Sequence, residues 1–240
     1  MRAHASIRAE ADGQRGTRLA RLRSEVPLVL RQTPAPAGTA TVYLVGGAAG
    51  PLGGDRLRLD IEVGPDATLC VRTVAASVAL PARTGTSSRF EITVTVAGGG
   101  SLEWLPEPTV AAAGCHHVTS ASVELAEGAA LRWREELIFG RYGEPAGSAT
   151  ISTSVRYAGR PLLRQSLSIG DGAAGWDGPA VLDAAKATGS LLTVGSEVEA
   201  ADTPEVLGPT AVRMPLAGPG TLVCATAPDA HTLRKYLDWD

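Results

Sequence analysis

The feature that most constrains the fold is a short pattern that occurs three times along the chain. Each copy has an alternating apolar stretch, then four or five small residues that include Gly, then a Leu at which the alternation restarts. The three leucines, Leu69, Leu102 and Leu131, are spaced at about 30 residues, which is typical of one supersecondary unit repeated along a chain. Each such unit buries its face against its neighbours. The pattern therefore predicts stacked β-structure rather than a nucleotide-binding fold or a helix bundle.

Alternating hydrophobicity predicts strands over most of the chain. The clearest case is residues 56–63, where Leu57, Leu59, Ile61 and Val63 fall on one face. Residues 3–9 and 17–23 flank Asp12-Gly13-Gln14 and have the composition of a hairpin, and further strands are expected at 26–31, 41–45, 68–74, 89–96, 101–105, 118–125, 130–139, 149–157, 162–169, 191–194, 210–214 and 221–225.

Two segments have helical signals. Residues 179–187 begin with Pro and stop at Gly189, and the last segment opens at Pro228-Asp229 and carries a stripe of Leu233, Tyr236 and Leu237. No stretch has the composition of a linker between domains. The expected fold is mainly β, with stacked, helicoidal (β-helix-like) sheets and a few short helices, one of them C-terminal, in a single domain over residues 1–240.

Composition sets limits on the partners and the compartment. The net charge is −3, which gives no general reason to expect nucleic acid or a membrane. The Arg-rich start of the chain is interpreted as a solvated strand pair, since it lacks the aromatic residues that nucleic-acid surfaces interleave. Cys70, Cys115 and Cys224 form no CxxC pair, which favours a reducing compartment. With no apolar signal segment, the cytoplasm is expected.

The glycine-dense loop Gly46–Asp55 could suggest a phosphate site. It contains no GxxxxGK[ST] motif, and a strand follows it rather than a helix. The better interpretation is a place where backbones pass closely, with the Asp55 carboxylate capping the turn.

The run Cys115-His116-His117 could suggest a metal site. In a strand, neighbouring side chains point to opposite faces, so at most Cys115 and His117 converge. His4 and His231 are the only other histidines, whereas a tight transition-metal site needs three or four ligands. A tight site is therefore not expected, and whether this run contacts metal stays open.

The pair Glu135-Glu136 could suggest general acid–base chemistry. Adjacent strand residues face apart, so these carboxylates cannot flank one bond as glycosidase carboxylates do. The inward one needs a partner, and Arg132 and Arg134 are candidates for structural pairing; lining of an internal polar passage is the alternative. With no GxSxG motif or other recognisable nucleophile, the sequence predicts no catalytic residue and no enzyme activity.

Four segments in order resemble the urease accessory protein family UreD, called UreH in some bacteria. They are GGAAGPLGGDRLRLDIEVGPDA from Gly46, SLEWLPEPTV from Ser101, VELAEGAALRWREELIFGRYGE ending at Glu144, and GRPLLRQSLSI from Gly159. The N-terminal segment fits as well, so that the resemblance covers roughly residues 3 to 170. The combination of GGD before a strand, LPEPT and GRxGE is its most specific part.

The resemblance implies a non-enzymatic scaffold for nickel insertion into urease. Family members are β-rich helicoidal stacks that bind the urease apoprotein and a helical accessory protein, UreF, which recruits the GTPase UreG. Nickel is thought to pass through an internal tunnel without a tightly bound cofactor. Matched to this sequence, the weak and transient nickel ligands would be Asp55, Ser77 and Glu135.

The sequence departs from the family pattern at several points. The segment ASVALPARTGTSS lacks the Lys and Tyr of many relatives, Gln165 replaces a frequently acidic residue, and the region after Gly170 is short, with a helical stretch missing between Val194 and Pro209. Two other functions therefore stay open. One is a β-stack enzyme that acts on a polymer with Asp55 or Glu135 as its acid, and the other is a partner-binding β-solenoid unrelated to nickel.

Overall fold

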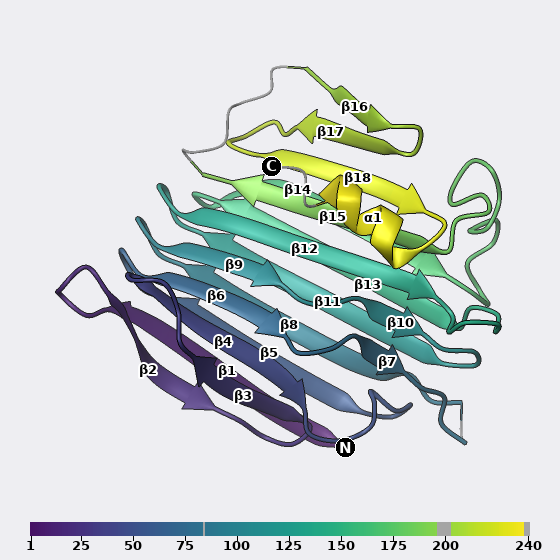
Figure 1. The fold of residues 1–240 in the computed structure, drawn as a ribbon, viewed down its shortest axis with the longest axis horizontal. Coiled ribbons are helices and arrows are strands. Elements are labelled where there is room, and N and C mark those ends of the chain that lie inside the picture. The colour runs from purple at the N-terminus through teal and green to yellow at the C-terminus, as the bar shows by residue number, and fades with distance from the viewer. Residues whose placement is uncertain (84, 196–202, 238–240) are drawn as a thin grey trace.

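Two large β-sheets face each other in the computed structural model, which describes residues 1–83, 85–195 and 203–237 (Figure 1). The first sheet has seven strands in the order β14-β13-β11-β8-β5-β1-β2. The five inner strands β1, β5, β8, β11 and β13 are parallel to one another. The edge strands β2 and β14 are antiparallel to their neighbours. The strands are β1 (Arg2–Ala11), β2 (Thr17–Arg23), β5 (Arg56–Val63), β8 (Ser88–Val96), β11 (His116–Leu125), β13 (Ser148–Tyr157) and β14 (Arg160–Ile169).

The second sheet has eleven strands, of which nine follow the order β16-β17-β18-β15-β12-β9-β6-β4-β3. The short strands β10 and β7 extend it beside β12. The strands are β3 (Leu28–Thr33), β4 (Thr39–Gly46), β6 (Thr68–Thr73), β7 (Ser77–Ala79), β9 (Ser101–Leu105), β10 (Thr109–Ala111), β12 (Ala130–Phe139), β15 (Ala187–Val194), β16 (Glu205–Gly208), β17 (Ala211–Pro215) and β18 (Thr221–Ala227).

The repeated sequence pattern corresponds to one strand in each sheet joined by a tight turn. The pairs are β5–β6, β8–β9 and β11–β12, so that the chain winds from sheet to sheet as a solenoid. Leu69 lies in register with Leu102, and Leu102 with Leu131, and all are buried. The prediction of stacked, helicoidal β-structure from these leucines is confirmed.

The three turns have the same backbone geometry. The residue three positions before each leucine has a positive φ: 56° at Asp66, 72° at Gly99 and 77° at Gly128. In each turn a backbone N–H donates to the carbonyl three residues earlier, as in a β-turn. A positive φ in a turn favours Gly, Asn and Asp, which is why small residues recur at these sites.

The core lies between the two sheets, where inward-facing side chains of both form one hydrophobic cluster. It includes the stacked pair Trp104 of β9 and Trp133 of β12, whose ring centroids are 5.2 Å apart. Neighbouring repeats thus contribute the largest side chains at adjacent positions of one sheet, which joins the solenoid turns through packing.

The C-terminal helix expected from the sequence is present as α1 (Ala230–Leu237). Asp229 caps it, because its Oδ1 accepts a hydrogen bond from Thr232 N at 2.7 Å. Leu233 and Leu237 are buried against the eleven-stranded sheet, where the helix packs on β15 and β18 (Figure 1). No helix among the described residues is long and apolar enough to cross a membrane.

The prediction of a helix at residues 179–187 is wrong. The segment consists of turns, and β15 already begins at Ala187. Asp183 has a φ of 49°, which a right-handed helix cannot contain. Leu182 is buried, and Trp176 packs edge-on against Phe139, so tertiary contacts hold this loop. The short strands β7, β10 and β16 were not predicted, and much of the stretch between Val194 and Pro209 lies outside the described residues.

Candidate functional site

A cavity of about 440 Å³ lies between the sheets. Strands of both sheets line it, and loop residues 48–51 and 74–76 border it. Most of the lining is apolar, with a smaller set of polar residues that contribute side-chain or backbone atoms to it. The apolar residues include Leu28, Leu44, Leu57, Phe90, Ile92, Trp104 and Ile151, and the polar residues include Thr73, Ser77, Glu107, Thr109, His117, Thr119, Arg134, Glu135 and Glu136.

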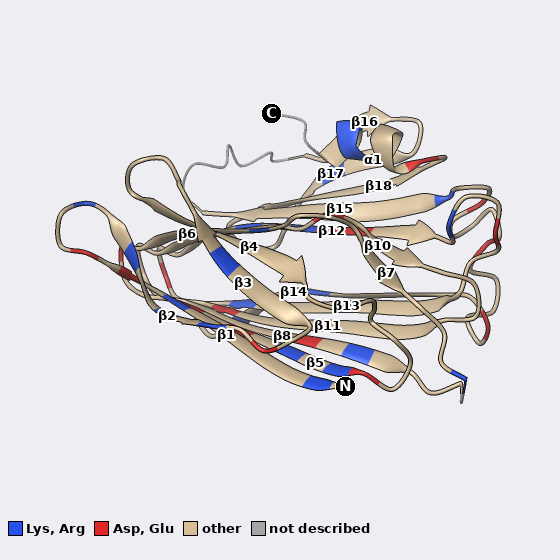
Figure 2. Cartoon of the chain, turned by 60° about the horizontal axis from the view of Figure 1, so that its bottom comes forward, with Lys and Arg blue, Asp and Glu red and all other residues tan. Residues whose placement is uncertain are grey.

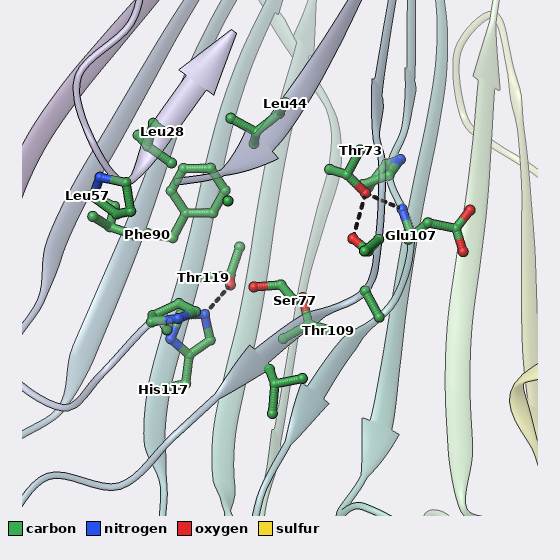
Figure 3. Close-up of a pocket in the computed structure, with 18 of the residues that line it drawn as sticks. Leu28, Leu44, Leu57, Thr73, Ser77, Phe90, Glu107, Thr109, His117 and Thr119 are labelled. Carbon is green, nitrogen blue, oxygen red and sulfur yellow. Dashed lines mark hydrogen bonds between the residues drawn. The ribbon is translucent and has the colours of Figure 1, made fainter. Parts of the chain in front are cut away.

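The LPEPT motif shapes one wall of this cavity. Pro106 and Pro108 have no N–H to donate, so the β9 ladder stops and resumes as β10. The carbonyl of Pro106 accepts a hydrogen bond from Arg134 Nη2 at 3.1 Å, and the backbone N–H of Glu107 donates to Thr73 Oγ1 at 2.8 Å (Figure 3). The motif thus interrupts the sheet while its freed polar groups stay bonded.

Glu135 is the carboxylate that faces the space between the sheets. Thr153 Oγ1 of β13 donates to its Oε1 at 2.7 Å, and Gln165 Nε2 of β14 approaches its Oε2 at 3.4 Å. Gln165 also donates to Ser190 Oγ at 3.1 Å. Burial raises the pKa of Glu135, and the hydrogen bond from Thr153 opposes part of this rise. The prediction that Arg132 or Arg134 pairs with the inward carboxylate is wrong for Glu135. Its carboxylate is held by the hydroxyl of Thr153 and the amide of Gln165.

Glu136 points to the opposite face of β12, beneath helix α1. Its Oε1 lies 2.9 Å from Arg134 Nε and 2.8 Å from Arg234 Nε. Arg134 is two residues away and therefore shares the face of Glu136, not that of Glu135. The structural pairing expected for this carboxyl pair is thus found, but on the helix-covered face.

His117, Thr119 and Ser77 direct polar atoms toward the same part of the cavity (Figure 3). Ser88 Oγ lies 2.8 Å from His117 Nδ1, and Thr119 Oγ1 lies 3.0 Å from its Nε2. Burial lowers the pKa of His117 to about 4. The imidazole is therefore neutral near pH 7, with one ring nitrogen donating and the other accepting.

The other two members of the Cys-His-His run do not join His117. His116 is exposed on the outer face of β11, whereas Cys115 is buried, with its thiol 3.6 Å from the carbonyl of Ser148. Burial raises the pKa of Cys115 to about 11, which keeps the thiol protonated. Within the described part of the chain, no group of three or more His, Cys, Asp and Glu is arranged to hold a metal ion.

Asp55 is separate from the cavity. Its carboxylate is buried, forms an ion pair with the N-terminal ammonium of Met1, and accepts a hydrogen bond from Leu52 N at 2.9 Å. It therefore caps the glycine loop, as the sequence indicated, and Gly50 and Pro51 of that loop line the cavity. A Cβ on Gly53 would lie 2.4 Å from Thr86 O, so the backbones pass closely there, as predicted.

The three residues singled out as nickel ligands are thus only partly together. Ser77 and Glu135 line one cavity, and Asp55 positions a loop at its border. Because Asp55 is enclosed by Met1 and its own turn, it does not converge with Glu135 across an open groove, as a glycosidase pair would. The polar groups that this cavity offers are thus one inward carboxylate, hydroxyls and a neutral imidazole.

Sequence reasoning singled out Gln165 but missed that it and Thr153 hold Glu135. Thr153 and Gln165 lie on strands of the opposite sheet, and their inward orientation follows from alternation along β13 and β14. Alternation could have placed them on the inner face. It could not have placed them opposite Glu135, because that depends on how the sheets are aligned.

Comparisons of the sequence with known proteins identify the family of this chain. A model of the family described as UreD urease accessory protein matches residues 1–239, which extends the similarity past Gly170 to nearly the whole chain. The protein named urease accessory protein UreD 3 of Streptomyces griseus is 47% identical, over 99% of this chain and 95% of its own length. Urease accessory protein UreD of Frankia alni is 46% identical, over 99% of this chain and 91% of its own length. The chain therefore belongs to the UreD family of urease accessory proteins.

Proposed function

We propose that this protein acts in urease maturation as a scaffold that binds the urease apoprotein and assists the delivery of nickel to it. Membership of the family supports the link to urease. The cavity that brings Glu135, Ser77 and His117 between the sheets supports the link to a cation in transit. Further elements of the proposal are a cytoplasmic location and a complex with helical UreF, through which the GTPase UreG joins.

The polar groups of the cavity suit nickel as a cargo. Imidazole nitrogen and carboxylate oxygen are both ligands of divalent nickel, and hydroxyl oxygens can complete a loose shell. The neutral imidazole of His117 offers such a nitrogen once a hydroxyl partner turns aside. No catalytic role is part of the proposal, and nickel is a passing substrate rather than a resident cofactor.

The same groups favour release over retention. Burial raises the pKa of Glu135, so a proton competes with a metal ion for this carboxylate. Thr153 already occupies one carboxylate oxygen at 2.7 Å. A cation would therefore have few ligands and would compete with a proton and with Thr153 for the Glu135 carboxylate. Such weak binding is what transfer to a tighter urease site requires.

The scaffold part of the proposal is tested by a pull-down of the tagged protein with urease apoprotein, with and without UreF. Specific capture of apo-urease is expected. Failure of folded protein to capture it, even with UreF present, would contradict the scaffold role.

The nickel part is tested separately with Glu135→Gln, which keeps the shape of the side chain and one oxygen to accept the hydrogen bond from Thr153, but removes the negative charge. The matched control is Glu124→Gln, because Glu124 is an exposed carboxylate of β11 paired with Arg156 at 3.3 Å. We expect Glu135→Gln to lower the nickel content per activated urease, while capture of apo-urease and the control stay unchanged. Normal nickel content with an intact complex would reject the cavity as a path and leave a partner-binding solenoid unrelated to nickel.

A further inference from the structure

Three arginines form one row on the outer face of the seven-stranded sheet. Arg2 of β1 lies in register with Arg56 of β5, and Arg56 with Arg89 of β8. All three side chains are exposed. Figure 2 shows the blue segments of β1, β5 and β8 gathered at this end of the sheet, close to the N-terminus. Three adjacent parallel strands thus carry the same charge at the same level.

Within the part of the chain that the structure describes, this arginine row has no acidic partner. Among the described residues, no carboxylate lies within ion-pair distance of Arg2, Arg56 or Arg89, whereas Arg58 on the same face is paired with Asp60 at 2.9 Å. The next row of the same strands mixes His4, Arg58 and Glu91. Like charges directly opposite each other on neighbouring strands destabilise a sheet. A sheet face that serves only solubility is therefore expected to mix positive and negative side chains, as the row of His4, Arg58 and Glu91 does.

The spacing of the row fits carboxylates on a helix. Neighbouring strands lie about 4.8 Å apart, so the arginines repeat at nearly this interval across the sheet. Residues three or four apart on a helix have Cβ atoms about 5–6 Å apart, whereas same-face residues of a strand are about 6.6 Å apart. The spacing of the arginines is therefore closer to that of carboxylates on a helix, and each guanidinium can pair with one carboxylate through two hydrogen bonds. Val118 continues the row on β11, and no aromatic side chain interleaves it, which disfavours nucleic acid.

We propose that the arginine row is a docking surface for an acidic α-helix of a partner protein, with the helix axis crossing β1, β5 and β8. The row is on the outside of the sheet, so this surface is separate from the inter-sheet cavity and does not depend on nickel transfer. Because the arginines are exposed, the contact is expected to weaken with salt and to act mainly on association and specificity.

The test uses the full-length protein and a fluorescent alanine-rich peptide of about 20 residues with Glu at i, i+4 intervals, a length that supports helix formation. Binding is followed by fluorescence anisotropy at low salt. Arg56→Glu is compared with Arg164→Glu, because Arg164 is an exposed arginine on the same outward face, at the far strand β14. A peptide of equal charge with Glu scattered around the helix and a single-stranded oligonucleotide serve as competitors.

We expect Arg56→Glu to weaken peptide binding by about tenfold and Arg164→Glu to change it by less than about twofold. The scattered peptide should bind more weakly than the aligned one. Equal loss in both variants, equal binding of both peptides, or tighter Arg56-dependent binding of the oligonucleotide would each overturn the proposal.

A second measurement separates docking from folding. Arg56→Gln removes the central charge of the row and should leave the melting temperature unchanged or higher, because it relieves repulsion between like charges. The same variant should still bind the aligned peptide more weakly. A lower melting temperature for Arg56→Gln would show that the row stabilises the sheet itself, and the docking role would be rejected.

Discussion

Arg234 of helix α1 lies against Glu136 of β12, with its Nε 2.8 Å from Oε1, although the two residues are 98 positions apart in the chain. Arg234 also reaches Glu107 of the LPEPT motif at 3.2 Å. The helix is thereby tied to the strand that carries Glu135 on its other face. One strand thus presents one carboxylate to the cavity and its neighbour to the C-terminal helix.

Loss of the Arg234 contact should destabilise the fold strongly. Arg234→Ala leaves the almost fully buried carboxylate of Glu136 with Arg134 as its remaining close cation, so we expect the free energy of unfolding to fall by about 3 kcal/mol. Urea unfolding measures it. Arg213→Ala removes the more exposed Arg213–Glu205 pair and should cost less than about 1 kcal/mol. Similar losses for both variants would contradict a special role for Arg234.

His117 should make the fold sensitive to acid. Its folded pKa, about 4, lies below the ordinary value of 6.5, so the unfolded chain binds the proton more readily between these values. The stability due to the neutral imidazole is complete above the unfolded pKa and is lost as the pH falls toward 4, by up to about 3 kcal/mol.

His117→Gln should therefore flatten the pH dependence of unfolding between about pH 7 and pH 4 relative to the unmodified protein. His116→Gln, at the exposed neighbour, should leave the curve as it is. Denaturant midpoints across this range measure both, and an unchanged slope for His117→Gln would show that His117 is not buried in its neutral form.

The buried leucine row should carry much of the stability of the solenoid. Leu102→Ala opens a cavity between Leu69 and Leu131 and should cost about 3–4 kcal/mol, because the rigid repeats on both sides relax only partly. Val206→Ala is the reference, since Val206 is 79% exposed and should change stability by less than about 0.5 kcal/mol. Thermal unfolding decides between them.

The turn between the second pair of strands requires glycine. Gly99 has a φ of 72°, and a Cβ there would lie 2.1 Å from Asp66 Oδ1. We expect Gly99→Ala to destabilise the fold by about 1–2 kcal/mol. Asp66→Gly at the equivalent position of the preceding turn should cost less, because glycine accepts its φ of 56° without strain. Chemical denaturation measures both losses of stability. Equal losses for Gly99→Ala and Asp66→Gly would contradict the steric requirement for glycine at position 99.

Gln165 should keep the cavity from retaining nickel. Gln165→Glu would place a second carboxylate near Glu135, where the Gln165 amide now lies at 3.4 Å, and would give a cation two anionic ligands. We expect nickel affinity to rise by about tenfold and transfer to urease to slow. Calorimetric titration with nickel chloride and the rate of urease activation measure the two effects; unchanged affinity would contradict a cation path past Glu135.

The sequence by itself determined the local elements and the repeat. Alternation with a period of two identifies strands, and small residues that tolerate a positive φ identify turns. Both signals are local, because strands and turns depend on residues that are neighbours in the chain. Leu69, Leu102 and Leu131 therefore indicated the stacked fold, Asp229 marked the start of α1, and the glycine loop was recognised as a close crossing capped by Asp55.

Only the tertiary structure decided what meets across the sheets. Short strands such as β7 carry too few residues for a period, and the turns near Leu182 depend on packing against the body of the fold. The partners of Glu135, Glu136 and His117 likewise follow from sheet alignment and helix docking. Alternation fixes the face on which a side chain lies, whereas the group opposite that face is set by contacts between distant segments, which no local pattern records.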